Sequence, residues 1–236
     1  MAAAVVAPIC YRRESNAMPR LLFKKTGNAV WISHLDLMRL FQRAFKRAGL
    51  PLTHSHGFNP RASISIALPL SVGVESACEL LDFALDGVSI PQTEIKDRLN
   101  AALVEGVTVI DVYDNGRKIR DLSLMQCRID LFYDDVLPAD AVERISALFM
   151  KNEIIVPKKT KTGMQDQNII TMIRNVHIDT TGEKSLAIHA VINCQNPSLN
   201  PAQIPLAVGM YLPELKPAHY KCSRIEIYDS GEKVFR

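Results

Sequence analysis

The clearest alternation of apolar and polar positions in the chain begins at Ser33 and ends at Gly49. Apolar residues recur there every three or four positions, at the spacing of one helix face. They are Leu37, Met38, Phe41, Ala44, Phe45 and Ala48. Ser33 suits an N-cap and is followed three residues later by Asp36, a shortened capping box, and Gly49 suits the position after the last turn. The segment predicts an amphipathic helix.

Extended patterns surround this helix in the first half of the chain. Strands are predicted for residues 20–32 (with a turn or bulge at Thr-Gly-Asn), 50–70 (interrupted by a turn at 57–60), 77–87 and 107–115. A second helix, with Pro91 near its start, is predicted for residues 91–106. The predicted order is strand, helix, strand, strand, helix, strand.

The second half repeats this order more faintly, after a polar linker at 113–123. Strands are predicted for residues 125–134, 153–159, 186–193 and 222–229. Helices are predicted for 138–152, with Pro138 at its start, and for 200–212, interrupted by Pro205. Residues 157–185 give no clean periodicity, and their first part is polar and basic.

Two successive βαββαβ orders predict an α+β fold of tandem ferredoxin-like units, each an antiparallel sheet covered by helices. We expect the first unit to span 18–116 and the second, more divergent unit to span 117–236. Residues 15–18 read Ser-Asn-Ala-Met, which is typical of tag removal. We therefore set residues 1–17 aside as a tag remnant and expect the native chain to start at Met18.

The composition, 47% hydrophobic and 22% charged, is that of a soluble globular protein. Its five cysteines are scattered and never form C-x-x-C, which indicates reduced, buried thiols rather than a disulfide framework or zinc cage. No apolar run approaches the ~20 residues of a membrane helix. We expect a cytoplasmic protein.

The net charge of +3 is small, so the placement of basic residues matters more than their number. Arg39, Arg43, Lys46 and Arg47 follow i, i+4, i+7, i+8 spacing and share one side of the first predicted helix, where they could grip a phosphate backbone. The alternative is an ordinary solvated helix face. Further basic candidates for the same anion-binding surface are Lys24, Lys25, Arg61, Lys158, Lys159 and Lys161.

The stretch THSHGFNPR, residues 53–61, offers candidate chemistry beside that helix. His54 and His56 share a face if the segment is extended, and His34 is a further imidazole nearby. Without more ligands they predict no metal site. One of the three histidines could act as a general acid or base on RNA, bind an anion beside Arg61, or form structural hydrogen bonds. Phe58, next to the turn, is expected to anchor in the core.

Several enzyme classes lack their motifs here. The chain contains no G-x-x-x-x-G-K-[ST], G-x-G-x-x-G, H-E-x-x-H or G-x-S-x-G. Three cysteines within a short span are also absent, so the chain cannot hold a radical-SAM iron–sulfur cluster alone. We expect no bound cofactor.

Residues 23–76 carry a resemblance to a known family. The motifs SHLDLMR, RAGLP, S-x-GFNP and PL-x-VG-x-ES together resemble the radical-SAM-linked proteins, the domain of unknown function 2344. Members of that family stand alone in bacteria or are fused behind a radical-SAM enzyme, often near genes for ribosomes and RNA processing. Ala62 stands where the family turn usually has a second proline. The resemblance implies a radical-SAM enzyme as partner and an RNA-related context.

Three functions remain open at this point. The first is a non-catalytic RNA-binding or substrate-presenting accessory to a separate radical-SAM enzyme, which rests on the basic helix and the resemblance. The second is an RNA-processing enzyme that uses His34, His54 or His56 as acid or base. The third is a protein–protein adaptor whose basic face docks on an acidic partner.

Overall fold

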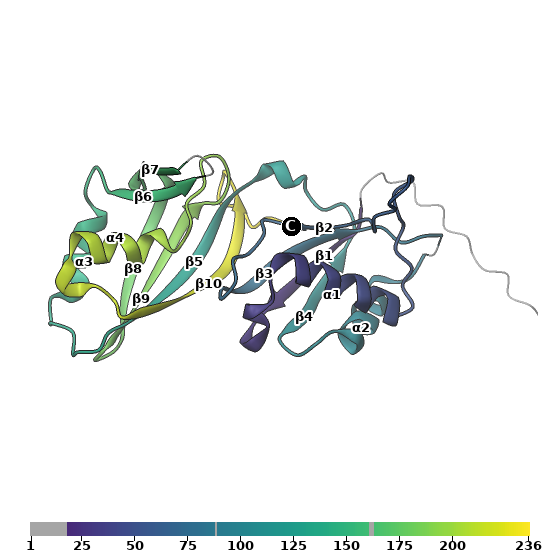
Figure 1. Cartoon of the computed structure of the whole chain (residues 1–236), viewed down its shortest axis with the longest axis horizontal. Coiled ribbons are helices and arrows are strands. Elements are labelled where there is room, and N and C mark those ends of the chain that lie inside the picture. The colour runs from purple at the N-terminus through teal and green to yellow at the C-terminus, as the bar shows by residue number, and fades with distance from the viewer. Residues whose placement is uncertain (1–17, 88, 161–162) are drawn as a thin grey trace, which may run out of the picture.

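The computed structural model describes residues 18–87, 89–160 and 163–236. The proposed tag remnant, 1–17, therefore lies outside the described residues. The protein is a mixed α/β structure in which four α-helices pack on one face of a large, mostly antiparallel sheet (Figure 1). The strand order of this sheet is β4-β1-β3-β10-β5-β9-β8, and β2 also pairs with β3.

The first half has the predicted element order. Its elements are β1 (Arg20–Lys25), the 3-10 helix η1 (Gly27–Trp31), α1 (His34–Arg47), β2 (Ile64–Ala67), β3 (Glu75–Phe83), α2 (Gln92–Ala102) and β4 (Val107–Tyr113). Every strand pair within this half is antiparallel. The segment expected as one strand with a bulge, 20–32, ends its pairing at Lys25 and continues as η1.

The second half contains more strands than predicted. After the short helix η2 (Ile119–Asp121) its elements are β5 (Leu122–Phe132), α3 (Ala141–Phe149), β6 (Ile155–Thr160), β7 (Gly163–Asn168), η3 (Ile170–Met172), β8 (Ile173–Gly182), β9 (Ser185–Asn193), α4 (Gln203–Tyr211), η4 (Pro213–Leu215) and β10 (His219–Asp229). Strands β6 and β7 form a separate two-stranded sheet. The expectation that the strand at 153–159 is the second sheet strand of this half was therefore wrong, because β8 takes that place.

Helix α1 begins and ends as its sequence predicts. The Ser33 hydroxyl accepts a hydrogen bond from the backbone N–H of Asp36 at 3.2 Å, and Gly49 has a φ of +66°, in the left-handed region. Helix α4 differs from the prediction at Pro205. This proline is the third residue of α4, where the missing N–H removes no hydrogen bond within the helix, so the helix is not interrupted.

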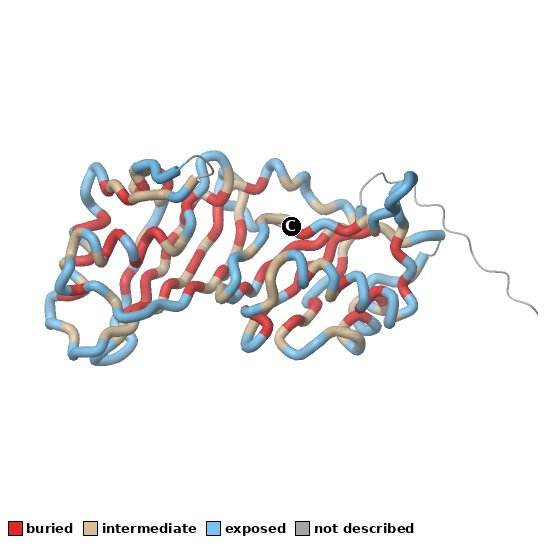
Figure 2. The backbone as a smooth tube through the Cα atoms, in the orientation of Figure 1, coloured by how far each residue is buried: buried red, intermediate tan, exposed pale blue. Residues whose placement is uncertain are grey.

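Each pair of helices buries its own core against the sheet (Figure 2). Helices α1 and α2 pack on β1, β3 and β4, whereas α3 and α4 pack on β5, β8 and β9. The two halves join where β10 pairs in parallel with the start of β3, at Glu75 and Ser76. β2 occupies the same edge of β3 further along. The sheet therefore runs through both halves, and the boundary at 116 stays a prediction.

Candidate functional site

A groove beside α1 gathers several of the candidate residues. We call it the α1 groove: it has a volume of about 870 Å³ and lies between α1 and residues 50–64. Arg43 and Lys46 line it from the helix, and His54 and Arg61 line it from the facing loop. All four are exposed. The structure thus brings two helix cations, one imidazole and one loop guanidinium to the same depression.

The facing loop is a small hairpin held by its own backbone. The Ser55 N–H donates to the Arg61 carbonyl at 2.9 Å, and the Arg61 N–H donates to the Ser55 hydroxyl at 3.0 Å. Gly57 has a φ of +131° at the tip, which a glycine adopts readily. Phe58 next to it is fully exposed, so its expected anchoring in the core was wrong. The tip therefore presents a bare aromatic ring beside the α1 groove.

The other two helix cations have partners within the protein. Arg39 forms an exposed ion pair with Asp36 at 2.9 Å, and hydrogen bonds from Ser33 and Arg39 lower the pKa of Asp36. Arg47 donates to the carbonyl of Ala102 at the end of α2, at 2.6 Å. Arg39, Arg43 and Arg47 also line a second hollow of about 480 Å³ on the other side of α1. Arg43 is thus shared by both depressions.

The remaining predicted cations lie elsewhere. Lys24 is exposed, but Lys25 is 1% exposed and donates to the carbonyl of Ile32 at 2.8 Å, which removes it from any surface. Lys158 donates to the Ser198 carbonyl and Lys159 is exposed, both on β6 in the other half of the molecule (Figure 1). Lys161 lies outside the described residues.

The three candidate histidines do not form one site. His34 is the first residue of α1, whereas His54 faces the helix near Arg43 and Lys46, ~14–18 Å along the axis at 1.5 Å per residue. His56 lies in the exposed tip of the hairpin. Among the described residues, no group of three or more His, Cys, Asp or Glu is placed to bind a metal ion.

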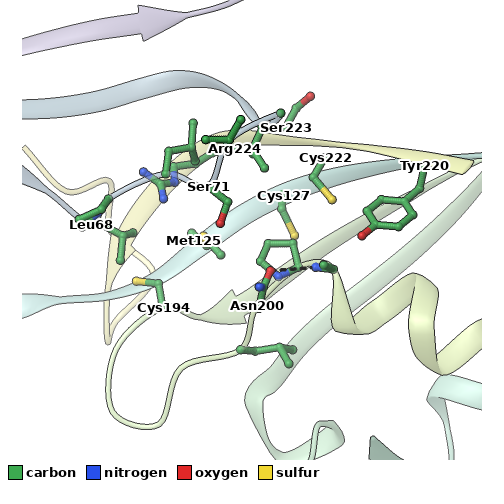
Figure 3. A pocket seen from close by; sticks show the side chains of 18 of the residues that line it. Leu68, Ser71, Met125, Cys127, Cys194, Asn200, Tyr220, Cys222, Ser223 and Arg224 are labelled. Atoms are coloured by element: carbon green, nitrogen blue, oxygen red, sulfur yellow. Dashed lines mark hydrogen bonds between the residues drawn. The ribbon is translucent and has the colours of Figure 1, made fainter. Parts of the chain in front are cut away.

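A further site, which the sequence did not reveal, lies where the two halves meet. We call it the central pocket; it has a volume of about 450 Å³. Its floor comes from β5 and β10, and its walls come from residues 68–74 and 199–202 (Figure 3). Trp31 and Tyr220, 70% and 44% exposed, line it as aromatic side chains. Residues 70–76 belong to the PL-x-VG-x-ES motif, but the other walls lie more than a hundred residues away.

A buried ion pair underlies this pocket and connects the halves. Arg224 of β10 donates to a carboxylate oxygen of Glu79 on β3 at 2.5 Å, with side chains 6% and 1% exposed. The other Glu79 oxygen and the Arg224 Nε have no hydrogen-bond partner in the structure. Lys25 is near enough to interact with Glu79, and burial lowers the pKa of Lys25. Glu79 is therefore the counter-charge of two buried cations.

Four buried thiols lie near or on the pocket floor. Burial raises the pKa of Cys78, Cys127 and Cys222 to about 12 and that of Cys194 to about 11. All four are free thiols, as the scattered spacing predicted. Because the thiolate is the nucleophile and the metal ligand, these neutral groups line an apolar floor and are poorly suited to covalent chemistry.

We expect these four thiols to react with an aromatic disulfide reagent at pH 8 at least about a hundredfold more slowly in the native than in the denatured protein. The measurement uses a Cys10→Ser background, since Cys10 lies outside the described residues. The folded-state pKa values exceed the unfolded value of about 8.5, so the folded state holds more protons above that pH. The contribution of the thiols to stability therefore falls as pH rises from about 8.5 toward 12. Equal native and denatured rates would contradict this.

A polar cluster lies on the face of the sheet without helices. His177 is 2.8 Å from Asp179, and His189 lies 3.5 Å from the same carboxylate. The three residues line a shallow hollow over β8 and β9. The sequence missed this cluster because β8 itself was not predicted.

Sequence comparison places the chain among bacterial proteins. The family model described as "Uncharacterized protein conserved in bacteria (DUF2344)" matches residues 19–201. The chain belongs to this family. The match confirms the resemblance at the level of the family, and the radical-SAM link stays a prediction. The matched range includes the α1 groove and the two wall segments of the central pocket.

Other comparisons concern the fold. A search of curated proteins finds no match. The "Crystal Structure of a Cbf5-Nop10-Gar1 Complex" contains a chain that is similar at a TM-score of 0.50 and 9% identity, over 89% of this chain and 49% of that one. "Structure of H/ACA RNP bound to a substrate RNA containing 2'-deoxyuridine" gives 0.50 and 9%, over 92% and 49%. The chain thus spans about half the length of these structures, and the likeness shows the fold alone.

Proposed function

We propose that this protein binds single-stranded RNA through the α1 groove and presents it to a separate radical-SAM enzyme, without catalysing a reaction itself. The observation that carries the RNA proposal is the convergence of Arg43, Lys46, His54 and Arg61 on one groove, beside the bare ring of Phe58. Cations that track a phosphate backbone, together with an aromatic ring that stacks on a base, are the usual elements of single-strand binding.

The enzyme alternative has less support from the geometry. General acid–base catalysis needs a group within about 3 Å of the proton it moves, usually with a second group to orient it. His34 and His54 are separated along α1, and the thiols of the central pocket have pKa values of about 11 to 12. RNA cleavage that is lost on changing His34, His54 and His56 to Ala would favour the enzyme. The adaptor alternative predicts partner capture that withstands RNase.

The partner and the fold are part of the same proposal. The radical-SAM partner rests on the family resemblance. We also propose that each half is a ferredoxin-like unit, since the orders β4-β1-β3-β2 and β10-β5-β9-β8 are equivalent once the β6–β7 hairpin is set aside. The H/ACA RNP structure is described as bound to a substrate RNA, which is compatible with RNA binding on a fold of this kind.

We expect Phe58→Ala to weaken binding of a labelled single-stranded RNA by about 1–3 kcal/mol, the effect of losing one stacked base. Stability should not change, because the side chain is fully exposed. Fluorescence anisotropy and thermal unfolding measure the two quantities. Met150→Ala, which removes an exposed apolar side chain in the second half, is the matched control. An equal loss of affinity in both variants would count against a specific role for the ring.

A further inference from the structure

The central pocket combines features that suit one chemical class of ligand. Its volume of about 450 Å³ falls within the usual range of small-molecule sites. Met125, Cys127 and Cys222 give it a flat, apolar and polarisable floor, and Trp31 and Tyr220 line it with exposed aromatic rings (Figure 3). A planar ring system would contact sulfur on one side and the aromatic rings at the opening.

The polar groups of the pocket favour a neutral ring over a phosphate. Arg224 lines the pocket but carries its counter-charge with it, since Glu79 accepts from it at 2.5 Å. The Nε of this 6% exposed side chain has no hydrogen-bond partner. Ser71 adds a hydroxyl on the same wall. Such donors suit the carbonyl oxygens and ring nitrogens of a heterocycle, and the apolar floor offers no compensation for a dianion.

The position of the pocket connects it to the basic surface. Trp31 lines the pocket, and Ile32 lines the second hollow together with Arg39 and Arg43. Arg43 in turn also lines the α1 groove. The three depressions therefore follow one another along α1, with cations between the groove and the pocket.

We propose that the central pocket binds a nucleobase, the unstacked base of the RNA strand whose backbone follows α1. Bases that leave the stack are commonly held between aromatic side chains and read along their polar edges. This inference rests on the proposed function for the strand, but the recognition of the base depends on the pocket's own residues.

The test uses Trp31, the single tryptophan of the chain, as a reporter in the pocket. Its fluorescence is followed during titration with each of the four nucleoside 5′-monophosphates, and with ribose 5-phosphate, which has the same sugar and phosphate but no base. We expect saturable quenching by at least one monophosphate and none by ribose 5-phosphate. Tyr220→Ala and Cys222→Phe should each weaken it about tenfold. Ile225→Ala, on the same strand but outside the pocket lining, should leave it unchanged.

Tyr220→Ala keeps the test valid if Cys222→Phe fails to fold, because Tyr220 is exposed. Equal effects of ribose 5-phosphate and the monophosphates would overturn the inference, as would unchanged quenching in a folded pocket variant. The Arg43→Glu, Lys46→Glu variant separates the two proposals. Loss of oligonucleotide binding with retained quenching supports both. Quenching in a wild-type protein that binds no oligonucleotide would overturn the α1 proposal and leave the base pocket standing.

Discussion

Replacing Arg43, Lys46 and Arg61 together by Ala lowers the affinity for single-stranded RNA by about 10–100-fold at moderate salt, if the α1 groove holds the backbone. Each lost phosphate contact also releases fewer counterions, so the slope of log K against log salt should become shallower by about 0.7 per contact, or about 2 in total. Anisotropy titrations at several salt concentrations measure both quantities. The three side chains are exposed, so the variant should fold normally.

A charge-matched control distinguishes the groove from net charge. Lys151, Lys184 and Lys216 are exposed and lie in the second half of the molecule. Their triple replacement by Ala removes the same charge and should leave affinity and salt slope nearly unchanged, since effects on exposed charges beyond a Debye length are screened. If both triple variants lose affinity equally, the attraction is general and the α1 groove has no special part in it.

Replacing Glu79 by Gln lowers the free energy of unfolding by about 3–5 kcal/mol. The carboxylate is 1% exposed and is the counter-charge of Arg224, with Lys25 also close. Without it two cations remain buried and uncompensated, which is the costly way to break a buried pair. Urea denaturation measures the effect, and a second expectation is that Trp31, at the junction of the halves, reports it in the same transition.

The matched control is Glu75→Gln, on the same strand but exposed. It should change the free energy of unfolding by less than about 0.5 kcal/mol. A loss below about 1 kcal/mol for Glu79→Gln would mean that the buried pair is relaxed by water or rearrangement, and that the β3–β10 junction depends on other contacts.

The sequence predicted the parts of the fold that local pattern determines. Helix α1 was found with its cap and its end because Ser33, Gly49 and the apolar stripe all act within one helix. Strand β8 was missed because it lies at the edge of the main sheet and much of it is exposed, so its residues show no alternation of apolar and polar positions. The same holds for β7, which is mostly exposed.

The sites were predicted only where they are local in sequence. Arg43 and Lys46 share a helix face, and Arg61 follows soon after, so their grouping was within reach of spacing arguments. The central pocket joins residues near 31, 70, 127, 200 and 222, which no pattern in the chain connects. Lys25 was misjudged because a lysine in a strand does not reveal which partner, here the carbonyl of Ile32, it meets after folding.

The most direct test of the account is ultraviolet crosslinking in cells, followed by sequencing of the RNA and mass-spectrometric mapping of the crosslinked peptides. The account predicts recovered RNA, with crosslinks concentrated in residues 38–62, around Phe58 and the α1 groove. Absence of crosslinked RNA, or crosslinks confined to the helix-free face around His177 and His189, would contradict it.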